Sequence, residues 1–372
     1  MLNLHYLFTS NDSDSFINRL NPTVKTLETI KKSRADIRAY LKRNLPHMLK
    51  NKTNISFPVE PKFFTQGSHR YKTLNEPAHL PPQQSDIDDG CYLPTEDWID
   101  NYNMPKLASQ DFYDAVEATL CPLCKNQNWK LDTSKATCVR IVISQDIHVD
   151  IPLYAIPEKE FKHLIEARQL IMDSHFADSA SVSWEKLPTE HVMLAHRKNG
   201  WVKSDPRLVV DWVQEQKELY SDQYTRVVRY LKAFRDFNWI SEGPSSLLLM
   251  VMASQNFRFC KNRDDLALLH VCAEIPKLLS TEVRNPTDTE EILTERLHDK
   301  EQAIQRFKHL NEMLNKAIYR SNASDANKLL RNLFGSRMPL RPDVIKDDGS
   351  QLSDFASFSV PVNELIGRTR AG

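Results

Sequence analysis

Glycine is scarce in this chain, and an excess of either charge is absent. The 372 residues include only 8 glycines against 20 prolines, which predicts few hairpin turns and a helix-rich fold with stiff loops. Lysine plus arginine and aspartate plus glutamate number 49 each, so no overall positive field is available to hold long nucleic acid. This balance argues against non-specific DNA or RNA binding and leaves only a local basic groove open.

Long apolar runs are also missing from the sequence. None approaches the roughly 20 residues that span a bilayer, so we expect no integral membrane segment. No secretory signal is recognised, and the six cysteines are therefore expected to be reduced thiols of a cytoplasmic protein. Cys121 and Cys124 have the spacing of half a zinc site, but no second pair completes it, so a metal there is the weaker interpretation.

The main chemical signal lies between Phe63 and Pro94, in FFTQGSHRYKTLNEPAHLPPQQSDIDDGCYLP. A Gly-Ser pair at 67–68 is followed by Asp86 and Asp88 on an expected strand. Side chains two apart on a strand point to the same face, so the two carboxylates would lie together and repel unless a cation sits between them. Mg²⁺ accepts such oxygen ligands while sharing substrate phosphates. The alternative is an acidic turn around Gly90.

Helical and strand patterns elsewhere place further candidates. A long amphipathic helix is predicted from 21–22 to Pro46, because Leu27, Ile30, Ile37, Leu41 and Leu45 recur at helical spacing. Two β-branched runs, 137–143 and 147–151, predict a hairpin whose second strand carries Asp150 as a candidate third metal ligand.

Next to that third acid, His148 is interpreted as a packed histidine rather than a ligand. Asp89 is expected to point away from the metal site, because it lies on the opposite face from Asp88. Further helices are predicted over 205–219, 224–239, 247–254, 264–279, 288–318 and 323–334.

Six sequence blocks, in order, resemble the CD-NTase family of cGAS/DncV-like nucleotidyltransferases, and most closely its DncV-like branch of bacterial cyclic GMP-AMP synthases. The blocks are QGSHRYKTLNEP, QSDIDDGCYLP, HVDIPLYAIP, SDPR, LKAFRD and GPSS. The resemblance implies an α+β fold with a polymerase-β-like nucleotidyltransferase lobe, built on a mixed sheet, and an α-helical lobe, with the active site in the cleft between them. The expected parts are an N-terminal region with a long spine helix (1–54), a catalytic lobe (55–200), a helical lobe (201–338) and a flexible tail (339–372).

The resemblance also implies roles for single residues. Asp86, Asp88 and Asp150 would be catalytic and hold two Mg²⁺ ions, for which Mn²⁺ can substitute. The remaining implied positions bind nucleotide and are Gln66, Gly67, Ser68, Tyr71, Arg140, Ser204, Lys232, Ser246 and Asp288.

For four of these nucleotide-binding residues, a purely structural role is the alternative. Lys232 could belong to a solvated helix face, and Ser246, after Gly-Pro-Ser, could be part of an ordinary helix N-cap. Tyr71 could be a core residue, and Arg140 could pair with a surface acid.

The implied activity is the synthesis of a cyclic second messenger, 3′,3′-cyclic GMP-AMP, from ATP and GTP in antiphage defence, where it would activate a separate effector protein. One alternative keeps the chemistry and makes another cyclic di- or trinucleotide or a linear oligonucleotide. The other is a catalytically silent nucleotide-binding regulator, against which the three intact acids argue.

Two expectations concern partners of the protein. No nucleic-acid activator is expected, because the chain lacks the His/Cys insertion with which the animal DNA sensor of this superfamily grips DNA. A free Gly372 would suit conjugation by a ubiquitin-transfer-like enzyme, and a frayed tail is the simpler alternative.

Overall fold

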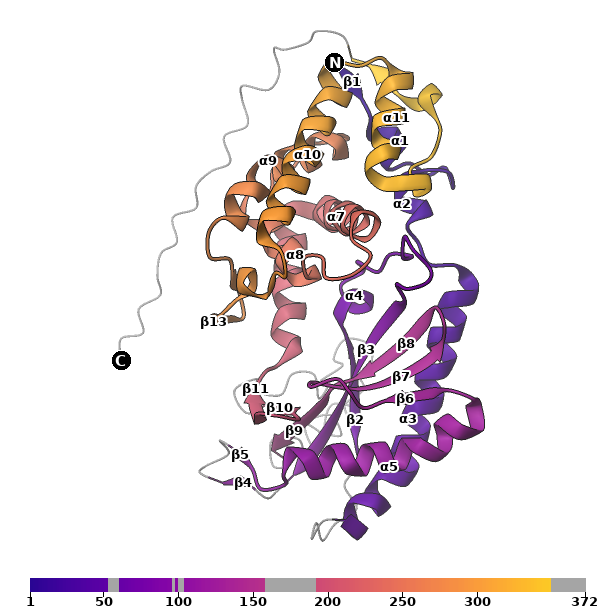
Figure 1. The fold of residues 1–372 in the computed structure, drawn as a ribbon, viewed down its shortest axis with the longest axis vertical. Helices are drawn as coiled ribbons and strands as arrows, with labels where there is room; N and C mark the ends of the chain where they lie inside the picture. The colour runs from indigo at the N-terminus through magenta and orange to yellow at the C-terminus, as the bar shows by residue number, and fades with distance from the viewer. Residues whose placement is uncertain (53–59, 96–97, 100–103, 158–191, 349–372) are drawn as a thin grey trace, which may run out of the picture.

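The computed structural model describes residues 1–52, 60–95, 98–99, 104–157 and 192–348. Figure 1 shows two lobes along the long axis of the molecule, one built on a sheet and the other from helices. A long helix, α3 (Val24–Lys52), runs from the junction of the lobes along the sheet lobe. The predicted α+β class, with a mixed sheet and a helical part, is confirmed.

The sheet of the first lobe is organised around its long strand β3. Strand β2 pairs with β3 in antiparallel fashion, whereas β8 and then β9 pair with it in parallel. Strands β7 and β6 continue the sheet beyond β8, and β10 and β11 continue it beyond β9, all in antiparallel fashion. The predicted hairpin over 137–143 and 147–151 is the β7–β8 pair. The eight strands are β2 (Lys62–Gln66), β3 (Ser85–Thr95), β6 (Lys130–Asp132), β7 (Val139–Ser144), β8 (Ile147–Ile151), β9 (Leu153–Pro157), β10 (Met193–His196) and β11 (Gly200–Lys203).

Helices α3 and α5 (Ser109–Gln127) bury their apolar faces on one side of this sheet. Helix α3 does not end at Pro46, where the sequence predicted its end. A proline removes one helical hydrogen bond, but Leu45 and Leu49, on either side of it, are both buried against the sheet core. Packing therefore carries the helix past the proline. The expected core position Leu27 is 41% exposed.

In the described residues, the second lobe contains five longer helices together with the first twenty residues of the chain. Leu4, Phe8 and Phe16 are fully buried there, and the rings of Phe8 and Phe16 pack against Tyr230 and Phe334. The elements of this lobe include α1 (His5–Phe8), α2 (Phe16–Arg19), α7 (Pro206–Asn238), α8 (Ser246–Gln255), α9 (Asp264–Leu279), α10 (Lys300–Tyr319) and α11 (Ala323–Phe334).

Short elements complete the description. The two ends of the described chain meet where β1 (Leu2–Asn3) pairs with β14 (Lys346–Asp347). The others are α4 (Gly67–Arg70), β4 (Trp98–Ile99), β5 (Met104–Pro105), β12 (Arg284–Asn285), β13 (Asp288–Ile292) and the 3₁₀ turns η3 (Leu293–Arg296), η4 (Gly335–Arg337) and η5 (Pro342–Val344).

Two predicted helices are confirmed as parts of one element, and another predicted helix is partly wrong. The helices expected over 205–219 and 224–239 are the two halves of α7, which breaks between them at Ser221 with φ 62° and ψ −175°. The helix predicted over 288–318 is wrong before residue 300. There the side chain of Asn285 accepts hydrogen bonds from Thr287 and turns the chain into the β12–β13 hairpin. Helix α10 begins only after Asp299, whose carboxylate caps it.

No helix in the described part of the chain is both long and apolar enough to cross a membrane. All six cysteines are unpaired thiols, as expected. Cys121 is half-buried and Cys124 buried on α5.

An ion pair between the buried Asp89 and the half-buried Arg38 joins α3 to the back of the sheet. Asp89 is 2% exposed and accepts a hydrogen bond of 2.6 Å from Arg38 Nε and a second, closer contact from Arg38 Nη2. Thr65 Oγ1 donates to the same carboxylate at 2.9 Å. Asp89 therefore faces the helix and points away from Asp86 and Asp88, as predicted from the alternation of the strand.

We expect the Asp89→Ala variant to lose about 3 kcal/mol of unfolding free energy, because it leaves the Arg38 guanidinium without its buried partner. Urea unfolding measures this loss. The control is Asp343→Ala, which removes an exposed partner of Arg341 and should leave the unfolding curve nearly unchanged. Equal curves for the two variants would contradict a structural role for Asp89.

Candidate active site

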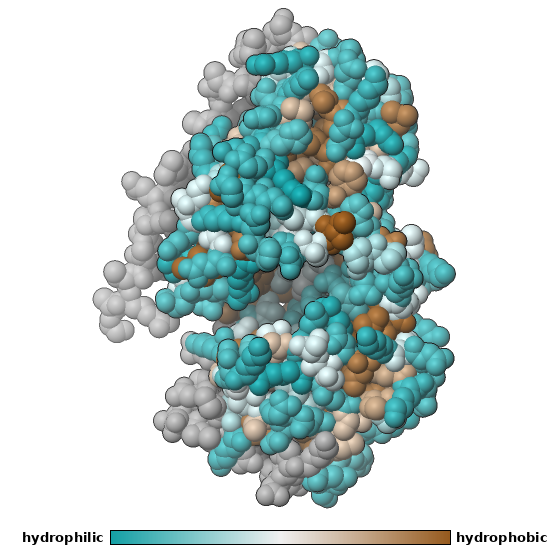
Figure 2. Space-filling view, in the orientation of Figure 1, coloured by the Kyte–Doolittle hydropathy of each residue, from teal (hydrophilic) through white to brown (hydrophobic). Residues whose placement is uncertain are grey.

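A cleft of about 550 Å³ lies between the two lobes. Figure 2 shows the surface hollowed there, with mostly hydrophilic residues around the hollow. The sheet lobe lines it with residues of α4, β3, β7 and β8, and the helical lobe with residues of α7, α8 and the loop between them. The sequence-predicted site residues that line the cleft are Gly67, Ser68, Tyr71, Asp86, Asp88, Arg140, Lys232 and Ser246.

Strand register gathers the acids on one face of the sheet. Asp88 pairs with Asp150 across the parallel β3–β8 ladder, and Asp86 pairs with His148 in the same ladder. Paired residues on neighbouring strands point to the same face. Gln66 and Arg140 extend the row, since Gln66 pairs with Asp88 and Arg140 with Asp150. The row therefore crosses four strands, and all four side chains share the cleft face of the sheet.

The acids repel one another where water is largely excluded. Burial raises the pKa of Asp88 to about 8, and the negative charges of Asp86 and Asp150 add to the shift, whereas Arg140 and Lys232 oppose it. Such a carboxylate keeps its proton at neutral pH until a cation arrives. Carboxylate oxygens are the donors that Mg²⁺ prefers, so the chemistry of these residues fits a divalent cation.

Arg140 binds the carboxylate of Asp150, so the three acids do not form a complete set of metal ligands in this structure. Its Nε and Nη2 donate to the two oxygens of Asp150 at 2.6 and 2.7 Å. In the part of the chain that the structure describes, no three ligating side chains converge as a formed metal group. The metal-binding role predicted for Asp150 therefore requires its carboxylate to contact both Arg140 and the cation. The alternative that Arg140 pairs with a surface acid is wrong, because its partner is an acid of the site.

The turn at Gly67 leaves no room for a side chain. Its φ is +66°, and a Cβ built there would lie 2.0 Å from Asp88 Oδ2. Glycine is thus required twice, for its left-handed backbone and for the close approach to a metal-ligand candidate. Gln66, just before it, is buried behind the cleft, where its side-chain amide hydrogen-bonds the Tyr154 hydroxyl at 3.2 Å.

The helical lobe contributes a buried amine. Lys232 is 4% exposed, which rules out a solvated helix face, and its Nζ donates to the Thr73 carbonyl at 2.7 Å. Burial lowers the pKa of Lys232 to about 8, helped by Arg235 and opposed by Asp236 and Asp86. An amine held this way is available to an anion that enters the cleft.

The two serines after Gly243-Pro244 have different roles. Ser245 is the N-cap of α8, because its Oγ accepts from the Leu248 amide at 3.1 Å. Ser246 Oγ accepts from Arg235 Nη1 at 3.0 Å. Sequence reasoning missed Arg235, although it follows Lys232 by almost one helical turn in the block LKAFRD.

Four predicted residues, Gln66, Asp150, Ser204 and Asp288, are not among those that line the cleft, whereas Tyr71 is. Ser204 is half-buried, and its amide donates to the Val192 carbonyl. Asp288 is exposed at the start of β13. Tyr71 lines the cleft while packing against the helical core, and burial raises its pKa. Gly372 lies outside the described residues.

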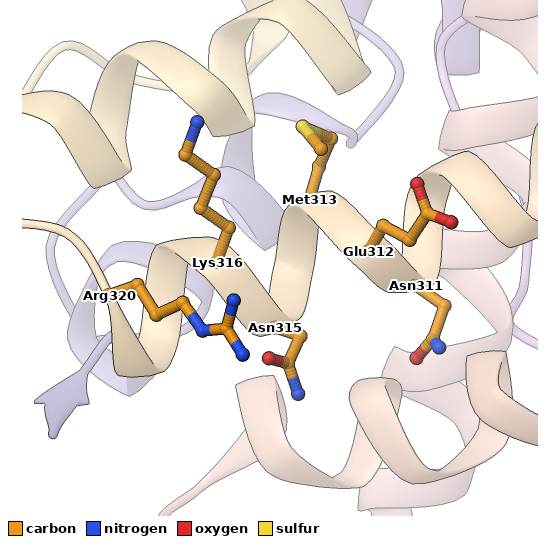
Figure 3. A pocket seen from close by; sticks show the side chains of 6 residues that line it. All are labelled: Asn311, Glu312, Met313, Asn315, Lys316 and Arg320. Atoms are coloured by element: carbon orange, nitrogen blue, oxygen red, sulfur yellow. The ribbon is translucent and has the colours of Figure 1, made fainter.

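A second depression, of about 500 Å³, lies on α10. In Figure 3, Asn315 and Arg320 lie close together, and Asn311 and Glu312 lie further along the helix. It contains none of the predicted site residues and only one carboxylate, so it offers no comparable set of metal donors.

Two family models match the chain. Residues 61–154 match the cyclic GMP-AMP synthase DncV-like nucleotidyltransferase domain, and residues 221–346 match the cyclic GMP-AMP synthase C-terminal domain. The first segment carries Gly67 and the three aspartates, and the second carries Lys232 and Ser246.

Curated relatives and solved structures agree with these matches. A cyclic GMP-AMP synthase of Vibrio cholerae is 34% identical over 303 residues, which cover 75% of this chain and 68% of the relative. One from Escherichia coli is 30% identical over the same shares. The structure of Vibrio cholerae DncV with the linear intermediate 5′ pppA(3′,5′)pG superposes with a TM-score of 0.78 at 25% identity, covering 94% of this chain and 99% of that one. The structure of that enzyme with GTP and 5MTHFGLU2 gives 0.79 at 25% identity, covering 94% and 100%. The resemblance found in the sequence blocks is confirmed.

The raised pKa of Asp88 makes stability depend on pH. The metal-free native state keeps this proton up to about pH 8, whereas an unfolded chain loses it near about pH 4. The native state thus binds more protons between these values, and its stability falls as the pH rises. In EDTA we expect Asp88→Asn to be more stable than the wild type, by a margin that grows from about pH 5 to 8. Urea unfolding at each pH checks this, and a margin independent of pH would contradict it.

Gly67 and Gly200 form a matched pair for testing whether the close approach of Gly67 to Asp88 supports metal binding. Both have positive φ, +66° and +73°, but a Cβ at Gly200 meets nothing within 4 Å. Alanine at either position costs about 1 kcal/mol of backbone strain, and only Gly67→Ala displaces the Asp88 carboxylate. We expect Gly67→Ala to weaken Mg²⁺ binding by about 10-fold or more, measured by calorimetry, with Gly200→Ala near the wild type. Equal weakening in both variants would show that strain alone is responsible.

Proposed function

This chain belongs to the DncV-like cyclic GMP-AMP synthase family of nucleotidyltransferases, and we propose that it joins ATP and GTP into 3′,3′-cyclic GMP-AMP. The proposal rests on one observation above all. Strand register places Asp86, Asp88 and Asp150 on one face of the sheet, and the buried Lys232 lines the same cleft from the helical lobe. A site with acids on one wall and an amine on the other suits a triphosphate together with divalent cations.

Each side chain then has a physical task. Asp86, Asp88 and Asp150 would hold two Mg²⁺ ions, or Mn²⁺ in their place, which activate the attacking hydroxyl and neutralise the triphosphate. Gly67 lets the backbone approach the phosphates, and Ser68 donates a hydrogen bond to them. Lys232 binds the triphosphate as a point charge, with Ser246 beside it.

The reaction proceeds by two transfers. The ribose hydroxyl of one nucleotide attacks the α-phosphorus of the other, loses its proton, and expels pyrophosphate. The linear intermediate then turns in the cleft, and its free hydroxyl closes the ring in a second transfer with loss of a second pyrophosphate. Gln66, Tyr71, Arg140, Ser204 and Asp288 stay proposed nucleotide contacts. Of these, Asp288 is exposed on its hairpin and lies outside the cleft lining.

We assign the product to signalling in the cytoplasm, where ATP and GTP are available. The cyclic nucleotide activates a separate effector in antiphage defence, and synthesis needs no nucleic-acid activator. In the proposed domain division, residues 55–200 carry the three catalytic acids, residues 201–338 carry Lys232, and residues 1–54 include the spine helix.

Labelled ATP and GTP, incubated with the protein and Mg²⁺, test the reaction. We expect pyrophosphate release and a phosphatase-resistant product that contains both nucleotides. Asp86→Asn combined with Asp88→Asn should lower the rate by at least about 100-fold, because it removes several kcal/mol of metal-borne stabilisation. Asp343→Asn is the matched exposed control. A phosphatase-sensitive product would identify a linear oligonucleotide instead, and unchanged pyrophosphate release in the double variant would refute metal-dependent catalysis by these acids.

A further inference from the structure

His148 is a buried imidazole at the cleft that the proposed reaction does not use. It lies on β8 two residues before Asp150 and pairs with Asp86 in the parallel ladder. The residue is 7% exposed and lines the cleft. Its position beside two of the three acids raises the question of what its two ring nitrogens contact.

The neighbour Gln84 determines which ring nitrogen carries the proton. The Gln84 side-chain nitrogen lies 3.2 Å from the Ser144 carbonyl and 2.9 Å from the Gln145 carbonyl. Carbonyl oxygens only accept, so this atom must be the amide NH₂, and the Gln84 oxygen must be the one that faces His148 Nδ1 at 3.0 Å. That oxygen also only accepts. Nδ1 therefore carries the hydrogen, and Nε2 of the neutral ring carries a lone pair.

The Nε2 lone pair has no partner. Among the described residues it is a buried nitrogen without a hydrogen bond. Asp150 Oδ2, which is also an acceptor, lies 3.9 Å from it. A second ring proton on Nε2 would have no acceptor within hydrogen-bonding distance, so the neutral ring is the resting form. Asp150 Oδ2 already accepts from Arg140 Nη2 at 2.7 Å, so Nε2 is the acceptor that lacks a donor, and leaving a buried polar group unpaired costs about 1–3 kcal/mol.

We propose that His148 Nε2 accepts a hydrogen bond from an O–H group coordinated to the cation that Asp86 and Asp150 hold, and so positions that cation. The donor is either a metal-bound water or the attacking ribose hydroxyl. His148 remains neutral throughout and transfers no proton. It acts as a positioning residue through the oxygen that it holds. The inference rests on the proposed function, because it assumes a divalent cation between these acids.

Two amide substitutions separate the two ring nitrogens. Glutamine places its oxygen near the position of Nε2, whereas asparagine reaches only the position of Nδ1 and keeps the contact with Gln84. We expect His148→Gln to bind Mg²⁺ with nearly the wild-type affinity and His148→Asn about 10-fold more weakly, by calorimetry on the full chain without nucleotide. A packing role would make the shorter side chain and the longer one differ in unfolding free energy but not in Mg²⁺ affinity.

Nitrogen NMR of ¹⁵N-histidine-labelled protein observes the lone pair directly. The His148 signals are assigned by their loss in His148→Gln. We expect a protonated Nδ1 and a bare Nε2 without metal, and a shift of Nε2 toward the hydrogen-bonded range when Mg²⁺ is added. A shift on Mg²⁺ alone identifies water as the donor. A shift that requires GTP, and disappears with 3′-deoxy GTP, identifies the ribose hydroxyl.

The outcomes distinguish this inference from the proposed function. A proton on Nε2 in the metal-free protein, or an Nε2 signal unmoved by both Mg²⁺ and GTP, would overturn the role of His148 while pyrophosphate release continued. Absence of pyrophosphate release, with the Mg²⁺-dependent shift intact, would instead overturn the reaction and leave the positioning role standing.

Discussion

The repulsion among three carboxylates at one point of the sheet is the constraint on which the structure depends. Strand pairing brings Asp88 beside Asp150, and burial removes the water that would screen them. The fold partly compensates with two cations, Arg140 on the same sheet face and Lys232 from the other lobe. What remains is a site in which Asp88 keeps its proton until a divalent cation binds, because two side-chain cations cannot neutralise three ionised acids.

The chemistry of the site was predictable from the sequence because it follows from alternation along strands. Asp86, Asp88 and the opposite-facing Asp89 needed only the two-residue period of β3. Contacts that depend on strand register and on how helices pack were not predictable from the sequence. Arg235, which donates to Ser246 within the helical lobe, was therefore missed, and the ion pair between Arg140 and Asp150 within the sheet could be expected only as a pairing with some acid.

The same distinction explains where the fold departed from prediction. Helices α9 and α11 begin and end where their apolar periodicity predicted. Helix α3 runs on through Pro46 because buried leucines on both sides outweigh one lost hydrogen bond. The segment 288–299 has helix-forming acidic residues, yet the Asn285 turn sends it into a hairpin. Local propensity was decisive where nothing opposed it, and a tertiary contact or a specific side-chain turn decided the other cases.

The row from Gln66 through Asp88 and Asp150 to Arg140 limits how such a chain can change length in evolution. A single residue inserted into any of these four strands, ahead of its member of the row, would turn that member toward the helix-packed core, and in β3, β7 and β8 it would bring an apolar neighbour to the cleft. Insertions and deletions are therefore tolerated in the connections, such as the proline-rich 76–84 segment, and not within the strands. Divergent relatives should differ in the lengths of their loops while keeping these strands free of gaps.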